Sequence, residues 1–79
     1  MASKVLVTGA SGQDGLLLCQ YLIRMGCDVV GIVRPDSLSK AHPFLKGVQI
    51  VEADLSMPQD YLSLMLKHMP DQVFHLAAS

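Results

Sequence analysis

Three regularly spaced glycines constrain the fold of this chain more than any other feature. Gly9 directly follows the apolar run at residues 5–8, and Gly12 and Gly15 come three and six residues later, where a helical pattern begins. A buried strand that turns sharply into a helix is typical of folds in which parallel strands alternate with helices. Gly9 permits the tight turn, Gly12 lets backbone N–H groups approach a ligand, and Gly15 lets the helix pack closely on the sheet.

A helical pattern follows the glycines. Residues 13–25 predict a helix because small and apolar residues recur at the spacing of one helical face. These residues are Gly15, Leu18, Cys19, Leu22 and Met25. Leu16, Leu17 and Ile23 extend the apolar surface beyond that face and indicate a second buried contact. Gly26 supplies the left-handed residue that commonly ends a helix.

Three further apolar runs, at residues 29–33, 48–51 and 73–78, predict strands. Ahead of the last run, Ser56 and Gln59 match a capping box, and Pro58 is tolerated in the first turn of a helix. One apolar stripe is predicted for this second helix. It consists of Leu62, Met65, Leu66 and Met69.

The order of these elements predicts an α/β fold, a Rossmann-like parallel sheet with flanking helices. Right-handed crossovers give the expected strand order 3-2-1-4, and strands 1 and 4 then flank the switch point at which ligands bind. Residues 36–47 carry the weakest pattern, with at most a helical turn near 37–42. We expect one unit over residues 1–79, the N-terminal part of a cofactor domain.

Composition excludes several classes of protein. The chain has 79 residues, of which 51% are hydrophobic and 16% charged, with a formal net charge of −1. These values argue against disorder and against bulk nucleic-acid binding. The longest apolar run is too short for a membrane span, and the apolar strand begins too early for a signal peptide, so we expect a cytoplasmic protein with no membrane partner.

The cysteines and histidines indicate no metal site. Cys19 and Cys27 stand eight residues apart without a Cys-x-x-Cys pair, and the three histidines share no ligand spacing with them. We interpret both cysteines as small buried hydrophobes.

The helix that begins after Gly12 is a candidate phosphate site. Its first N–H groups have no partner within the helix, and the helix dipole adds partial positive charge there. Ser11 and Gln13 are candidates for phosphate contact by position, whereas the dipole stabilises Asp14 with or without a ligand. The alternative is that the glycines only make a tight turn.

The end of the second strand indicates the cofactor. An acid there would bind a ribose 2′-hydroxyl, but this chain has Val33 followed by Arg34. A guanidinium suits a 2′-phosphate, which favours NADP, with NAD as the alternative cofactor. Arg34 could also be a solvated charge at a strand end.

The Gly-x-x-Gly-x-x-Gly spacing after Thr8 resembles the short-chain dehydrogenase/reductase superfamily. Gly12-Gln13-Asp14-Gly15 and Gly31-Ile32-Val33-Arg34 are similar to its nucleotide-sugar branch, and most similar to the GDP-mannose 4,6-dehydratases. Asp54-Leu55 and Leu76-Ala77-Ala78 match the extended members. The resemblance covers all 79 residues but only the first half of the family's cofactor domain. Pro35 departs from it, because those dehydratases often have a second arginine at this position.

The resemblance implies further contacts to the cofactor. Asp54 would accept a hydrogen bond from the adenine amino group, unless it caps the following helix. Apolar walls and backbone groups would come from the two short segments that match the extended members, although plain strand packing is an alternative for them. These residues are Leu55, Leu76, Ala77 and Ala78.

Catalytic residues are not found in this sequence. The superfamily resembled uses a Tyr-x-x-x-Lys pair on one helix. In this chain the residue four positions after Tyr21 is Met25, and the residue four positions after Tyr61 is Met65, so neither tyrosine has the lysine. We therefore expect an NADP-binding segment of a nucleotide-sugar dehydratase, which is inactive alone and binds a sugar nucleotide only with further chain. The alternatives are a related epimerase or reductase, or a non-catalytic nucleotide-binding module. We also expect strand 4 to be covered by further protein or paired in a homo-oligomer.

Overall fold

The computed structural model describes residues 2–35 and 45–76, in a β-α-β-β-α-β order. The helical turn expected near 37–42 and two expected site residues, Ala77 and Ala78, lie outside these ranges. The elements are β1 (Lys4–Thr8), α1 (Gln13–Arg24), β2 (Asp28–Val33), β3 (Gln49–Glu52), α2 (Pro58–His68) and β4 (Gln72–His75). No helix in the described ranges has the length and hydropathy needed to cross a membrane.

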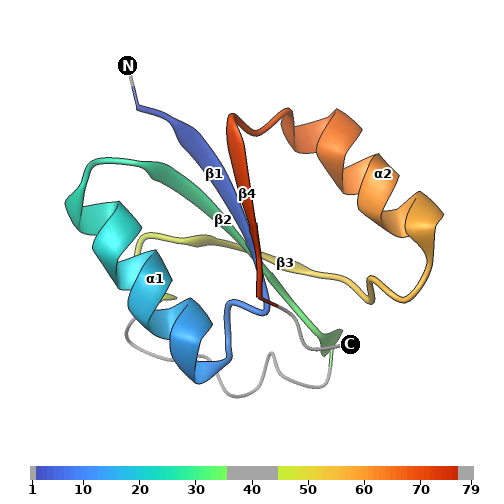
Figure 1. The fold of residues 1–79 in the computed structure, drawn as a ribbon, viewed down its shortest axis with the longest axis horizontal. Coiled ribbons are helices and arrows are strands. Elements are labelled where there is room, and N and C mark those ends of the chain that lie inside the picture. The colour runs from blue at the N-terminus through green and yellow to red at the C-terminus, as the bar shows by residue number, and fades with distance from the viewer. Residues whose placement is uncertain (1, 36–44, 77–79) are drawn as a thin grey trace.

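The sheet confirms the expected topology. All of its pairs are parallel, and the strand order is β3-β2-β1-β4. In the register, Thr8 at the end of β1 stands beside Ile32 of β2 and His75 of β4. The helix α1 covers one face of the sheet and α2 the other (Figure 1). The carboxyl ends of the four strands therefore share one edge, as expected for a ligand site in an open α/β sheet.

Two buried clusters, one on each face, follow from the alternation of side chains along the strands. Val5 and Val7 of β1 belong to a cluster that includes Cys19 and Leu22 of α1. Leu6, which lies between them, points to the other face and joins a cluster with Leu64 of α2. A central strand with apolar residues on both faces is what the continuous apolar run at residues 5–8 predicts.

Most of the inward face predicted for α1 is confirmed. Gly15, Cys19 and Leu22 are buried, but Met25 is 63% exposed, so its placement on that face was wrong. The helix ends before Met25 can face the sheet: the N–H of Cys27 donates to the carbonyl of Leu22, and Gly26 has φ +82°. This is the hydrogen-bond pattern of a Schellman motif, which turns the chain toward β2.

The second contact expected for α1 is present in part. Leu16 and Ile23 pack against the buried cluster, whereas Leu17 is 53% exposed. Burial of Cys19 raises the pKa of its thiol to about 11, which leaves it neutral and unreactive at physiological pH. Cys27 is half-buried, so only one of the two cysteines is fully in the interior.

The stripe predicted for α2 was mostly wrong. Leu62, Leu66 and Met69 are exposed, at 58%, 66% and 72%. The buried residues of this helix are instead Leu64 and His68, with Tyr61 and Met65 half-buried on the same side. Both sets recur at helical spacing, so the pattern alone could not select between them.

The capping box expected at Ser56 is also absent. The N-cap of α2 is Met57, without a side-chain hydrogen bond, and Pro58 occupies the first turn as expected. The N–H of Ser56 donates to Oδ1 of Asp54 at 3.1 Å, so Asp54 orders the turn ahead of the helix instead.

Candidate functional site

The first glycine of the motif makes the turn at the end of β1. Gly9 has φ +70°, in the left-handed region that favours glycine. The N–H of Gly12 donates to the Gly9 carbonyl at 3.0 Å, and the N–H of Ala10 donates to the Ile32 carbonyl of β2 at 3.2 Å. The turn is thereby held against the carboxyl ends of two strands.

Gly15 allows the helix to approach this turn closely. A Cβ atom built on Gly15 would overlap the carbonyl oxygen of Gly9 and stand 2.8 Å from Cα of Ala10. The obstacles are backbone atoms, which cannot move aside. Gly31 of β2 has a similar role, because its Cβ would stand 2.9 Å from Cβ of Ala10. These two glycines are required for packing, as the sequence predicted for Gly15.

Gly12 differs from both, because the fold does not require a glycine at its position. Its backbone is extended, with φ −73° and ψ 165°, which any residue adopts. Among residues 2–35 and 45–76, a Cβ there would meet the Gly9 carbonyl oxygen alone, at the ordinary distance of 3.4 Å. Gly12 is also exposed. What this glycine provides is open space over the first turn of α1.

The first turn of α1 has the character of an anion site. Gly12 is the N-cap residue, and no side chain of the described residues caps this turn. Gln13 and Asp14 are exposed and Ser11 is half-buried beside them. The N–H groups of an uncapped first turn and the helix dipole together favour a bound phosphate.

Arg34 and Asp54 follow the ends of two neighbouring strands. Val33 is buried, and its carbonyl accepts a hydrogen bond from the N–H of Ala53 at 2.9 Å, which holds β2 and β3 together at this edge. Arg34 and Asp54 come directly after these two residues and are both exposed. Leu55 is half-buried and packs against the cluster on the α2 face, which fits the packing alternative for this residue.

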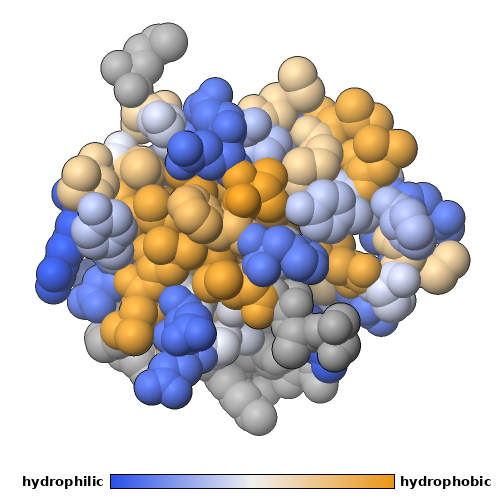
Figure 2. Space-filling model, in the orientation of Figure 1, coloured by the Kyte–Doolittle hydropathy of each residue, from blue (hydrophilic) through white to orange (hydrophobic). Residues whose placement is uncertain are grey.

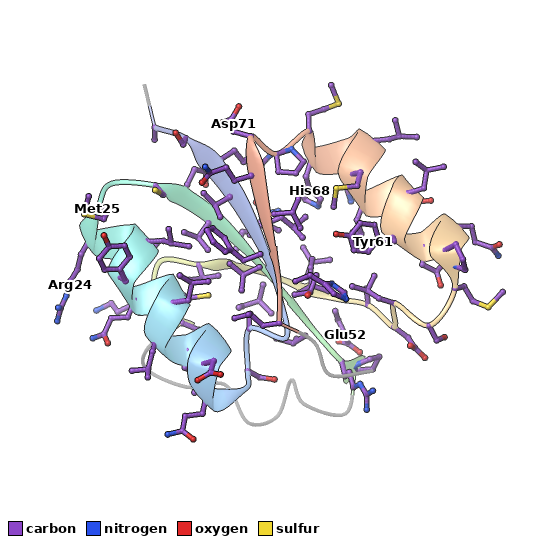
Figure 3. The ribbon with its side chains drawn as sticks, in the orientation of Figure 1. Arg24, Met25, Glu52, Tyr61, His68 and Asp71 are labelled. Atoms are coloured by element: carbon purple, nitrogen blue, oxygen red, sulfur yellow. The ribbon has the colours of Figure 1, made fainter. Side chains whose placement is uncertain are left out.

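A cluster of three polar side chains, which we call the Thr8–His75–Tyr61 cluster, joins β1, β4 and α2 at the same edge. Oγ1 of the buried Thr8 and Nδ1 of His75 share a hydrogen bond of 2.9 Å. The ring of Tyr61 meets the imidazole edge-on, with centroids 5.8 Å apart. Tyr61 points from α2 toward the sheet (Figure 3). Sequence reasoning did not include His75 in the site, although the parallel register of β1 and β4 pairs it with Thr8.

Leu76 follows this cluster and is 40% exposed, and its N–H donates to the Thr8 carbonyl at 3.2 Å. The structure thus brings the expected residues that it describes to one edge of the sheet, after the ends of β1, β2, β3 and β4. The arrangement can bind a phosphate-containing ligand across several strand ends. It contains no Tyr-x-x-x-Lys pair, because the sequence has none.

Comparisons with known proteins agree with this geometry. The model of the NAD dependent epimerase/dehydratase family matches residues 5–79. The chain is 33% identical over 75 residues to a GDP-mannose 4,6-dehydratase of Sordaria araneosa, covering 91% of this chain and 14% of that protein. It is 28% identical over 88 residues to a GDP-mannose 4,6-dehydratase of Vibrio cholerae, covering 99% of this chain and 24% of that protein.

Solved structures show the same fold. The Bordetella bronchiseptica enzyme WbmH in complex with NAD⁺ has a TM-score of 0.75 at 33% identity, covering 100% of this chain and 27% of that one. The UDP-glucose 4-epimerase of Thermotoga maritima, solved with UDP-glucose, has a TM-score of 0.78 at 26% identity, covering 96% and 24%. The chain therefore spans about a quarter or less of the length of these relatives.

Proposed function

Because the chain belongs to the NAD-dependent epimerase/dehydratase family, we propose that it is the NADP-binding N-terminal part of a nucleotide-sugar dehydratase of the GDP-mannose 4,6-dehydratase type. The binding and catalytic groups for the sugar nucleotide would come from chain beyond these residues. The proposal therefore assigns cofactor binding, and no catalytic step, to residues 1–79.

The observation that carries the proposal is the open space at Gly12. A glycine that neither backbone conformation nor packing requires stands over the uncapped first turn of α1. A pyrophosphate seated there would accept hydrogen bonds from backbone N–H groups and would gain from the helix dipole. Ser11 and Gln13 would add side-chain contacts from the turn, and Asp14 would remain a dipole-stabilised neighbour.

Two other strand ends would hold the adenosine half. Arg34 would bind the 2′-phosphate, which favours NADP over NAD. Asp54 would accept a hydrogen bond from the adenine amino group with the carboxylate oxygen that Ser56 does not use. The walls of this half-site would come from the four residues named for it by the resemblance. They are Leu55, Leu76, Ala77 and Ala78.

A sugar-nucleotide epimerase is the second candidate. The similarity in fold and sequence to the UDP-glucose 4-epimerase of Thermotoga maritima favours it. We prefer the dehydratase because Gly12-Gln13-Asp14-Gly15 and Arg34 are similar to that group. Turnover of GDP-mannose or of UDP-glucose by a longer protein that contains this segment would separate the two candidates.

Replacing Gly12 with valine tests the proposal. Gly12→Val places a branched side chain in the space assigned to the pyrophosphate, so we expect isothermal titration calorimetry to detect no binding of NADP⁺ or NAD⁺. The fold should persist with a loss of about 1 kcal/mol, the usual effect of valine at an N-cap.

Leu17→Val is the control, because it places a valine on the exposed face of the same helix without adding bulk near the first turn. It should bind both dinucleotides as the wild type does. Wild-type affinity in Gly12→Val, or a wild-type chain that binds neither dinucleotide, would contradict the proposed function.

A further inference from the structure

The Thr8–His75–Tyr61 cluster has no part in the function proposed above. Thr8 is fully buried and is the last residue of β1, directly before the Gly9 turn. His75 is the last residue of β4 and is exposed. A buried hydroxyl is therefore held by an exposed imidazole where β1 ends and the glycine turn begins.

Within the part of the chain that the structure describes, β4 contacts the end of β1 through a backbone hydrogen bond and a side-chain hydrogen bond. The N–H of Leu76 donates to the Thr8 carbonyl at 3.2 Å, and the Thr8 hydroxyl is bonded to His75 Nδ1 at 2.9 Å. The first bond fixes the peptide that joins Thr8 to Gly9. The second holds the side chain of the same residue. Rotation of the Thr8 backbone would have to break one of these bonds, to its carbonyl or to its hydroxyl.

Tyr61 restrains the imidazole in turn. Its ring meets that of His75 at an interplanar angle of 74°, the edge-to-face geometry that aromatic pairs prefer. Tyr61 is half-buried on the inward side of α2. His75 therefore stands between a strand end and a helix on the face opposite α1.

The direction in which the chain leaves Thr8 decides where the glycine turn lies. Gly9 has φ +70°, and its carbonyl oxygen accepts from the Gly12 N–H. A small rotation at Thr8 would displace that carbonyl, and with it Gly12 and the first turn of α1. Binding to fixed donors loses affinity when the donors are displaced from the ligand by even a fraction of an ångström.

We propose that His75 is a positioning residue for the dinucleotide site, which acts by holding Thr8 and thereby setting the orientation of the Gly9–Gly12 turn. The inference rests on the proposed dinucleotide function. It adds a side chain of β4, on the face of the sheet opposite α1, to the residues proposed for the site.

Two substitutions of His75 distinguish positioning from general support. Asparagine places a polar atom where Nδ1 stands, one bond beyond Cγ, and can keep the hydrogen bond to Thr8. Glutamine is equally polar and one carbon longer, and its amide reaches the position of Nε2 instead. Because His75 is exposed, both variants should fold. Tyr61→Phe, which retains the ring contact, is the control on α2.

The experiment uses the whole 79-residue chain labelled with ¹⁵N and titrated with NADP⁺ in the NMR spectrometer. In His75→Gln we expect shifted amide resonances of Gly9 and Gly12 in the free protein and an affinity for NADP⁺ lower by about 3- to 10-fold, the usual range for one lost hydrogen bond. In His75→Asn and Tyr61→Phe we expect the amide resonances of Gly9 and Gly12 and the affinity for NADP⁺ to stay close to those of the wild type.

Unchanged Gly9 and Gly12 resonances in His75→Gln, or equal affinities of the glutamine and asparagine variants, would overturn the positioning role while wild-type binding still supported the proposed function. Failure of the wild type itself to bind NADP⁺ would instead overturn the proposed function, and the positioning role with it.

Discussion

The proposed preference for NADP over NAD depends on Arg34. This residue follows the buried end of β2, and its side chain is exposed at the same edge as the glycine turn. Because a guanidinium binds phosphate with charge-assisted hydrogen bonds, Arg34→Ala should lower the affinity for NADP⁺ by about 10- to 100-fold. The affinity for NAD⁺, which lacks the 2′-phosphate, should change little.

A second arginine provides the control for this measurement. Arg24 is also exposed but lies at the opposite end of α1 from the glycine turn (Figure 3). Arg24→Ala removes the same charge and should leave the ratio of the two affinities unchanged in calorimetry. Equal losses for NADP⁺ and NAD⁺ in Arg34→Ala would show that Arg34 does not bind the 2′-phosphate.

At the scale of the element, α2 offers a direct test of its observed orientation. Leu64 is 9% exposed and Leu66 is 66% exposed, two residues apart on one helix. Leu64→Ala should lower the free energy of unfolding by about 2–3 kcal/mol, since it leaves a cavity against the sheet. Leu66→Ala should change it by about 0.5 kcal/mol or less. Urea denaturation measures both losses. A larger loss in Leu66→Ala than in Leu64→Ala would support the buried stripe predicted from the sequence.

We expect His68 to make the stability of the fold depend on pH. It is 6% exposed, and its Nε2 finds no hydrogen-bond partner among the described residues. Burial lowers the pKa of His68, and the positive charges of Lys4 and Lys67 lower it further. The unfolded chain therefore binds this proton more readily than the folded one, and stability falls as pH drops below the ordinary histidine value of about 6.5.

The variant His68→Leu isolates this effect. Between pH 7 and pH 5 the wild type should lose more stability in urea denaturation than His68→Leu does, because the variant cannot take up the proton. Other titrating groups change the stability of both proteins equally, so they cancel when the two losses of stability are subtracted. Parallel pH profiles would show that His68 is not protonated on unfolding.

At the scale of the whole molecule, β4 forms one edge of the sheet. Val73, Phe74 and Leu76 are 36%, 36% and 40% exposed, and residues 72–76 include neither proline nor a charged carboxylate or ammonium. On the side of the molecule shown in Figure 2, where β4 lies between α1 and α2, apolar residues form much of the surface. An open apolar edge of this kind pairs readily with another strand.

A polypeptide of residues 1–79 should therefore self-associate, and light scattering should report a dimer or a larger species. Phe74→Lys should shift it toward the monomer, because a lysine on an edge strand opposes pairing. Neither form should turn over a sugar nucleotide, since the Tyr-x-x-x-Lys pair is missing. A monomeric wild type would favour a self-sufficient nucleotide-binding module.

Local sequence patterns were sufficient to predict the order of the elements and the strand order of the sheet. The apolar run at residues 5–8, the glycine turn and the helical spacing after it each depend on neighbours within a few residues. Right-handed crossovers then leave β3-β2-β1-β4 as the expected strand order, and the structure has it. The special roles of Gly9 and Gly15 followed in the same way, from short-range geometry.

Contacts between side chains that are distant in the sequence could not be predicted from local patterns. Leu62, Leu66 and Met69 have the same helical spacing as the residues that α2 buries, and only its docking angle on the sheet selects the inward face. Thr8 and His75 are 67 residues apart, and their hydrogen bond exists because the parallel register of β1 and β4 places both at one edge. Periodicity records which residues of a helix or strand share a face, but what that face meets depends on the packing of the whole chain.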